Sequence, residues 1–110
     1  MITWPNRAVV DRAVRDWARR QGVRCPHLMR VGYFGSYARD TWGVGSDVDL
    51  VLIVSHAQRP WAERGAQWPL EALPVPAQAV VYTADEWERM QREGGRFARD
   101  LAHDTVWVYP

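Results

Sequence analysis

The sequence contains no lysine, and all fourteen of its basic residues are arginines. With thirteen acidic residues the formal net charge is +1, so the chain lacks the positive charge that favours non-specific binding of nucleic acid. Cys25 is the only cysteine, which excludes an internal disulfide and favours a reducing, cytoplasmic setting. The start, Thr3-Trp4-Pro5, does not resemble a secretion signal. The longest apolar run, Leu50–Val54, is far too short to span a membrane.

Small size and a surplus of tryptophan suggest that the chain works with a partner. Its 110 residues fit one domain, 1–110, with a modest hydrophobic core. Seven tryptophans are many for this length, and Arg and Trp are the residues most enriched at protein interfaces. We therefore expect a homodimer or a complex with another chain. The interface anchors that we expect are Trp4, Trp42, Trp61 and Trp68.

Hydrophobic periodicity and turn residues predict an α/β (α+β) fold, in which helices pack against a small mixed sheet of about four strands. The unbroken apolar run Leu50–Val54 indicates a central strand that is buried on both faces. Strict alternation along 28–34 would place Leu28 on the face opposite Val31 and Tyr33. Strands are predicted over 28–34, 47–54, 77–83 and 105–109. Helices are predicted over about 5–21, 37–40, 61–68, 84–93 and 96–103, with a helical turn at 70–73.

The first predicted helix is rich in arginine. Asp11 and Arg15, and likewise Asp16 and Arg20, are spaced to form ion pairs one turn apart. Because these acids interrupt the positive charge, we interpret this surface as a solvated face rather than a polyanion-binding one. Gly22 is expected to cap the end of the helix.

Two further short patterns have simple structural readings. Thr83 and Glu86 match a capping box, which predicts that a helix begins after Thr83. Cys25 and His27 lie close in sequence, but no other Cys or His stands at ligand spacing, so a metal site is not expected there. No role is assigned to His56 or His103.

The stretch from 33 to 55 is where the sequence indicates chemistry. Gly35-Ser36 follows one predicted strand, and Asp47 and Asp49 open the next. Side chains two apart on a strand share a face, with Cα atoms roughly 6–7 Å apart. Two close carboxylates repel each other, and Mg²⁺, which binds one or two carboxylates together with phosphate oxygens, relieves that repulsion. A phosphate can approach the bare backbone at Gly35, and the N–H groups after Ser36 would face it.

Plainer explanations exist for some of these residues. Ser36 fits the N-cap of a short helix, which is compatible with phosphate binding because the two share one geometry. Arg39 can reach a triphosphate or pair with Asp40, and the sequence favours neither. Asp47 could simply cap a turn. Asp49 has no such explanation, because it lies beside a core-type run where an unpaired carboxylate is costly.

The pattern Gly35-Ser36, Ala38-Arg39 and then Ser46-Asp47-Val48-Asp49-Leu50 resembles the signature of the DNA polymerase β-like nucleotidyltransferases. In its short length the chain resembles the minimal branch of this family. The resemblance implies a nucleotidyltransferase-like fold that uses Mg²⁺ and an NTP, with ATP the expected one. It implies that Asp47 and Asp49 are catalytic and bind metal. It also implies a nucleotide-binding role for Gly35, Ser36, Arg39 and Ser46.

The family places a third carboxylate beside the pair, on the strand after the connecting helix. Aligning the strand 77–83 on its end puts that position on Gln78, which cannot act as a general base at neutral pH. Asp85 lies beyond the other end of the strand, roughly 20 Å away. Glu71, in the preceding segment, could fold back, but nothing in the pattern requires it.

Two functions follow from the resemblance. The first is an enzyme that transfers a nucleoside monophosphate from Mg²⁺–NTP to a hydroxyl of a protein, a small molecule or a nucleic acid. The second is a nucleotide-binding antitoxin with little catalytic power, paired with a helical HEPN-type protein. Gln78 favours the second function, and a third carboxylate beside Asp47 and Asp49 would favour the first. A purely structural domain would leave Asp49 unexplained.

Overall fold

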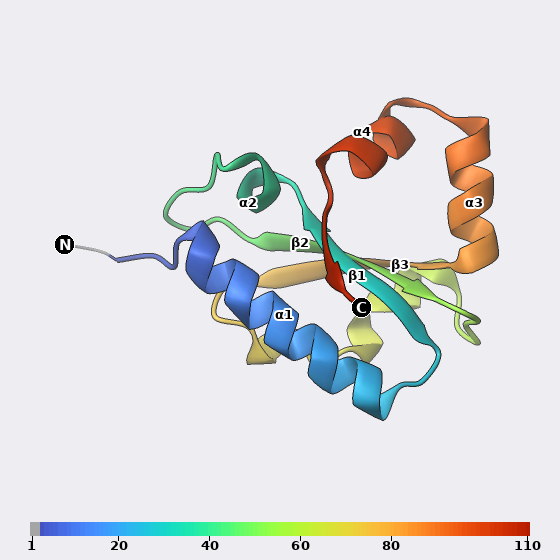
Figure 1. Cartoon of the computed structure of the whole chain (residues 1–110), viewed down its shortest axis with the longest axis horizontal. Helices are drawn as coiled ribbons and strands as arrows, with labels where there is room; N and C mark the ends of the chain where they lie inside the picture. Colours follow the sequence, from blue (N-terminus) through green and yellow to red (C-terminus); the bar gives the residue numbers. More distant parts are fainter. Residues whose placement is uncertain (1–2) are drawn as a thin grey trace.

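A computed structural model describes residues 3–110 of the chain (Figure 1). The helices and strands alternate along most of the chain, which is the order that the sequence predicts. The helices are α1 (Arg7–Arg24), α2 (Ser36–Arg39), α3 (Ala84–Glu93) and α4 (Arg96–Asp104). The strands are β1 (Leu28–Phe34), β2 (Val48–Val54), β3 (Ala77–Thr83) and β4 (Val106–Tyr109). No helix within residues 3–110 is both long enough and apolar enough to cross a membrane.

The four strands form one mixed sheet in the order β3-β2-β1-β4. β2 pairs with β1 in antiparallel and with β3 in parallel fashion, so it occupies an interior position. Its residues from Leu50 to Val54 are all buried. The prediction of a small mixed sheet with a buried central strand is therefore confirmed.

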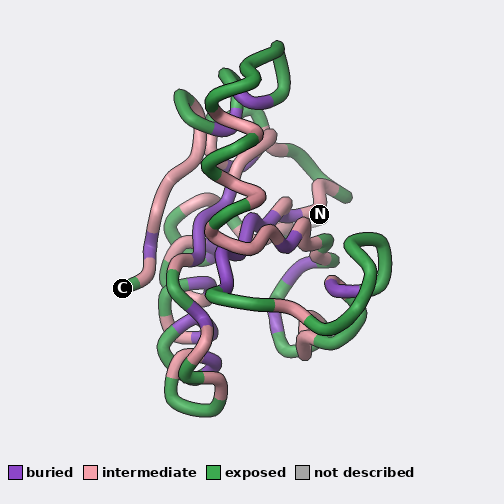
Figure 2. The backbone as a smooth tube through the Cα atoms, turned by 90° about the vertical axis from the view of Figure 1, so that its right-hand side faces the viewer, coloured by how far each residue is buried: buried purple, intermediate pink, exposed green. Residues whose placement is uncertain are grey.

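One face of the sheet forms the main core with α1 and the segment 73–75. Val10, Val14 and Trp17 of α1 are fully buried against alternate residues of the strands, such as Leu50 and Leu52. In Figure 2 the buried stretches run through the middle of the molecule and the loops at its periphery are exposed. α1 therefore covers this face of the sheet.

The other face of the sheet is covered by aromatic side chains and the two last helices. Val51 and Ile53 alternate with the core residues of β2 and are buried outside the main core cluster. Trp87 of α3 contacts the ring of Tyr82 at 5.8 Å and that of Trp107 at 5.5 Å between centroids. These contacts tie α3 to both edges of the sheet.

The first helix is longer than the sequence predicts. It continues through Gly22 to Arg24, and Cys25 rather than Gly22 caps it. A Cβ at position 22 would overlap the ring of Tyr109, so the glycine allows close packing of β4 on the helix. The ion pair between Asp11 and Arg15 is confirmed at 2.6 Å.

Two local predictions about residues 11–34 are wrong. Asp16 pairs with Arg19 and not with Arg20. Leu28 lies in the same core cluster as Val31 and Tyr33, because an irregularity in the pairing of β1 between Leu28 and Arg30 shifts the alternation.

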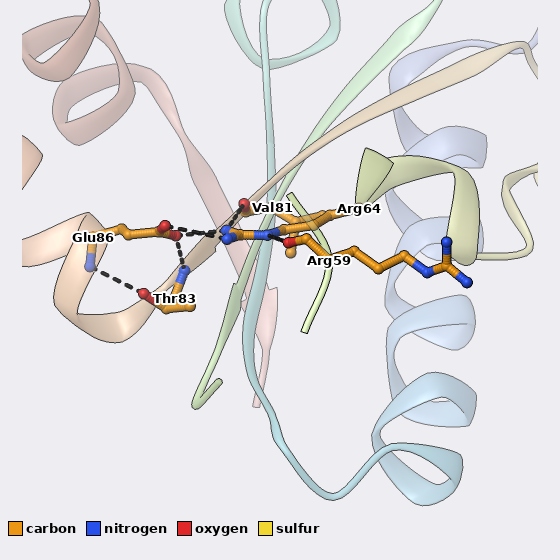
Figure 3. A network of polar contacts seen from close by, with 5 residues as sticks. All are labelled: Arg59, Arg64, Val81, Thr83 and Glu86. Atoms are coloured by element: carbon orange, nitrogen blue, oxygen red, sulfur yellow. Dashed lines mark hydrogen bonds and ion pairs between the residues drawn. The ribbon is translucent and has the colours of Figure 1, made fainter. Parts of the chain in front are cut away.

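The helix predicted over 61–68 is instead two short 3₁₀ helices, at Trp61–Glu63 and Gly65–Gln67, and a third follows at Leu70–Ala72. Side-chain hydrogen bonds from Arg64 hold this segment, as Figure 3 shows. The guanidinium binds the carbonyls of Arg59 and Val81 and both carboxylate oxygens of Glu86. Glu86 also accepts from the backbone of Thr83, so the predicted capping box is confirmed.

The tryptophans expected at an interface are mostly packed on the chain itself. Trp4, Trp42 and Trp68 are partly buried against the main core, which leaves less of each side chain free to serve as an interface anchor. Long-range packing decides this, since Trp68 contacts the ring of Trp17 from a distant part of the chain. Only Trp61, which is 48% exposed, is left largely uncovered among the four.

Candidate active site

Asp49 lies near the start of β2, the interior strand that is flanked by β1 and β3. In the sheet it pairs with Phe34, the last residue of β1, on one side and with Gln78 of β3 on the other. Paired positions on neighbouring strands point to the same face, so the three side chains form a row across the sheet. The row lies at the end of β1 where α2 begins.

Gly35 brings the turn before α2 into contact with the carboxylate of Asp49. Its φ of +74° and ψ of −150° belong to a region that is almost exclusive to glycine. A Cβ at this position would come closer to Oδ2 of Asp49 than the 3.0 Å that real Cβ atoms keep. The Gly-Ser turn and Asp49, which are separate in the sequence, therefore meet at one place.

The electrostatics of this place disfavour a charged Asp49 in the absence of a cation. Partial burial raises the pKa of Asp49 above its usual value, the nearby charge of Asp47 raises it further, and Arg39 acts in the opposite direction. Two carboxylates leave most of a cation's coordination to phosphate oxygens and water, which suits Mg²⁺ better than a site built from protein ligands alone. The donors present therefore fit a metal that arrives with a nucleotide.

The other predicted nucleotide-binding residues lie on α2 or on the loop before β2. Ser36 is the first residue of α2, and Gly35 takes the N-cap position, so the simple capping explanation for Ser36 is wrong. The hydroxyl of Ser46 accepts a hydrogen bond from the backbone of Gly43 at 2.7 Å, which shapes the loop. Arg39 is exposed and lies 3.9 Å from Asp104, so its suggested pairing with Asp40 is replaced by contact with α4.

The position beside Asp49 on β3 is held by an uncharged side chain. Gln78 is exposed and pairs with Asp49 in the parallel register. Asp85 follows Thr83, which pairs with Val54 at the opposite end of β2. Within residues 3–110, no three Asp, Glu, His or Cys side chains form a group that could hold a metal ion, so neither Glu71 nor a histidine completes the pair.

Comparison with known proteins agrees with this geometry. Residues 14–101 match the family described as the nucleotidyltransferase domain. The chain belongs to this family. The match includes the Gly35 turn, Asp47, Asp49 and Gln78, so it covers the whole candidate site. The predicted family and fold class are confirmed.

Solved structures that resemble this nucleotidyltransferase domain share its fold at low sequence identity. A proposed nucleotidyltransferase from Sulfolobus solfataricus has a TM-score of 0.64 and 17% identity, with 92% of this chain and 80% of that chain covered. A chain of a toxin–antitoxin crystallised with AMP-PNP has a TM-score of 0.59 and 16% identity, with 90% and 72% covered. A chain of the toxin–antitoxin MntA-HpeT, in a mutant with two aspartates replaced by glutamates, has a TM-score of 0.55 and 13% identity, with 90% and 71% covered.

The last helix of the nucleotidyltransferase domain contributes two neighbours that the sequence did not predict. Phe97 of α4, which is 49% exposed, packs edge-on against Phe34 at 6.1 Å between ring centroids. Asp104 at the end of α4 lies beside Arg39. No local pattern could have indicated these contacts, because about 60 residues separate the partners and only the β4 pairing brings α4 to this end of the sheet.

Proposed function

We propose that this nucleotidyltransferase domain binds an Mg²⁺–NTP, with ATP the expected nucleotide, at the Gly35 turn and the Asp47–Asp49 pair. The observation that carries the proposal is the packing of the Asp49 carboxylate against Gly35. A phosphate held at the turn would lie next to the two carboxylates, and the cation between them would neutralise both. Ser36, Ser46 and Arg39 would supply hydrogen bonds and positive charge to the phosphates.

The reaction that this site supports is transfer of a nucleoside monophosphate to a hydroxyl. The acceptor oxygen forms a bond to the α-phosphorus, the bond from that phosphorus to the bridging oxygen breaks, and pyrophosphate leaves. Bound Mg²⁺ would offset the charge that develops on the phosphates. The Gly35 turn and the residues beside it would hold the nucleotide, and Arg39 would lie near the negative charge of the phosphates.

The proton of the acceptor hydroxyl has no base in the place where the family keeps one. Gln78 can donate or accept a hydrogen bond beside Asp49, but its amide does not take up a proton at neutral pH. General-base catalysis contributes on the order of 10²–10⁴-fold to rates. We therefore propose a slow transferase whose nucleotide binding is intact.

The second candidate function is that of a nucleotide-binding antitoxin. Gln78 favours it, and so do two structural neighbours that are described as toxin–antitoxins. In this role the chain would bind a partner protein, and the expected partner is a helical HEPN-type chain. A homodimer remains the other expected assembly, and the exposed Trp61 is the strongest remaining candidate for an anchor.

Calorimetric titration with Mg²⁺ and ATP tests the binding step. Wild type should release heat and bind, and Asp49→Ala should bind at least roughly tenfold more weakly, a difference of about 1.4 kcal/mol. Asp85→Ala is the matched control, since Asp85 is an exposed aspartate on α3 beyond the far end of β3. No heat with wild type, or equal affinity for Asp49→Ala, would rule out the proposed site.

A further inference from the structure

A cavity of about 440 Å³ lies at the other end of the sheet from the Asp pair. Val54, the last residue of β2, lines it together with the end of α1 and the segment 56–69. Asp49 is five residues earlier on the same strand, which corresponds to about 17 Å. The cavity is thus separate from the candidate active site, and its volume is within the range of small-molecule sites, roughly 300–1,000 Å³.

A largely buried glutamine lines this cavity. Gln21 is only 4% exposed and is one of the residues that line the cavity. A ligand would have both a donor and an acceptor available from it.

The charged groups of the cavity favour an anion. Arg64, only 8% exposed, makes four hydrogen bonds from its guanidinium (Figure 3), which leaves one of its five N–H groups without a partner. Two of the four bonds go to the carboxylate of Glu86, which offsets much of the Arg64 charge. Arg24, at the end of α1, is exposed and adds a second positive charge. No acidic side chain among the residues that the structure describes lines the cavity.

One wall of the cavity is made of rings. The imidazole of His27 lies 5.2 Å from that of His56 and 6.5 Å from the indole of Trp68, measured between centroids. All three residues line the cavity, so a flat ligand can pack against them. Cys25 is also close, but the cluster is not a metal site, because no group of three suitable ligands occurs within residues 3–110.

We propose that this cavity is a second ligand site, which binds a small organic anion that contains a flat ring. The anionic group would lie toward Arg24 and Arg64, the ring would pack on His27 and Trp68, and Gln21 would bond to a polar edge of the ring. A nucleoside monophosphate and an aromatic carboxylate both have this chemistry, and both have a size that suits the cavity.

NMR titration of ¹⁵N-labelled protein tests the proposal with four probes: AMP, benzoate, inorganic phosphate and adenosine. AMP or benzoate, each with both ring and charge, should shift the indole signal of Trp68 and the imidazole signals of His27 and His56. Phosphate lacks the ring and adenosine lacks the charge, so each should bind at least tenfold more weakly than the probe that combines them. Which of AMP and benzoate binds more tightly identifies the class of ligand.

Variants separate this site from the first one. Gln21→Leu keeps a similar volume and should weaken binding about tenfold, the value of a lost hydrogen bond to a charged or polar ligand. His56→Ala, at an exposed residue, should also weaken it. Arg20→Leu is the control for the general positive field of α1, and Asp49→Asn is the control for the nucleotide site, and both should bind like wild type.

Several outcomes would overturn the proposal. They are the absence of shifts at millimolar AMP and benzoate, shifts confined to the residues around Gly35 and Asp49, and an affinity that Gln21→Leu and His56→Ala leave unchanged. In each of these cases the cavity holds water only. Because the Asp49→Asn control removes the first site and not the second, failure here is distinguishable from failure of the proposed nucleotide binding.

Discussion

Replacing Gly35 by alanine should damage nucleotide binding more than it damages folding. The backbone there has φ of +74° and ψ of −150°, and holding a residue with a side chain in such a region costs about 1–3 kcal/mol. The added methyl would also overlap Oδ2 of Asp49. The carboxylate is the free end of a side chain and can rotate away at little cost, but it then leaves the position beside the turn.

Two other glycines provide matched controls. Gly45 has a φ of +87° with open space where a methyl would be added, so Gly45→Ala introduces backbone strain without an overlap. Gly43 has neither, so Gly43→Ala should be neutral or should stabilise the protein by about 0.4–1 kcal/mol. Only Gly35→Ala combines strain with displacement of Asp49.

Urea denaturation and calorimetry with Mg²⁺–ATP would be run on all three variants. The free energy of unfolding should fall by about 1–3 kcal/mol for both Gly35→Ala and Gly45→Ala. Affinity for Mg²⁺–ATP should fall at least roughly tenfold for Gly35→Ala alone. If Gly35→Ala binds the nucleotide as wild type does, the contact between the turn and Asp49 has no part in binding and the reasoning fails.

Three further predictions concern stability. Burial and the charge of Asp47 raise the pKa of Asp49, so Asp49→Asn should make the metal-free protein more stable at pH 7. This gain in stability should vanish below the ordinary pKa of 3.8. Equal urea midpoints for wild type and Asp49→Asn at pH 7 would contradict the prediction. Hydrogen bonding by Arg64 lowers the pKa of Glu86, so Glu86→Gln should cost about 1–3 kcal/mol at pH 7 in urea denaturation. That cost should shrink as the pH falls below 4.5, and a cost independent of pH would count against it. Gly22→Ala should lower the free energy of unfolding by about 1–3 kcal/mol, because the added methyl overlaps Tyr109. In a double-mutant cycle Tyr109→Ala should remove most of that loss, and additive losses would refute the overlap.

Most of the sheet could be predicted from the sequence because its signals are local and strong. The apolar run Leu50–Val54 identified β2, and Thr83 with Glu86 marked the start of α3. The pairing of Gln78 with Asp49 also agrees with the alignment made from sequence alone. The roles of these residues in binding and chemistry stay predictions.

The errors arise where distant contacts override local patterns. A glycine such as Gly22 is typical of a helix end, but α1 continues past it to Arg24. Tyr109 packs on Gly22 from almost ninety positions later in the chain. The segment 61–68 has a helical pattern, yet the bonds from Arg64 to Arg59 and Val81 fix it in short 3₁₀ turns. The contacts of α4 with the site depend likewise on pairing between strands far apart in the chain.

The most direct test of the account is label transfer from ATP that carries its radiolabel on the α-phosphate. Wild type, Gln78→Asp and Gln78→Asn would be compared with protein and RNA of a bacterial lysate as acceptors. Asn has nearly the shape of Asp but is not a base, so Gln78→Asp alone should raise transfer, by some part of the 10²–10⁴-fold that a general base provides. ATP affinity should change little in either variant. A vigorous wild type that Gln78→Asp slows, or an equal gain from Gln78→Asn, would contradict the claim that a missing base beside Asp49 limits this protein.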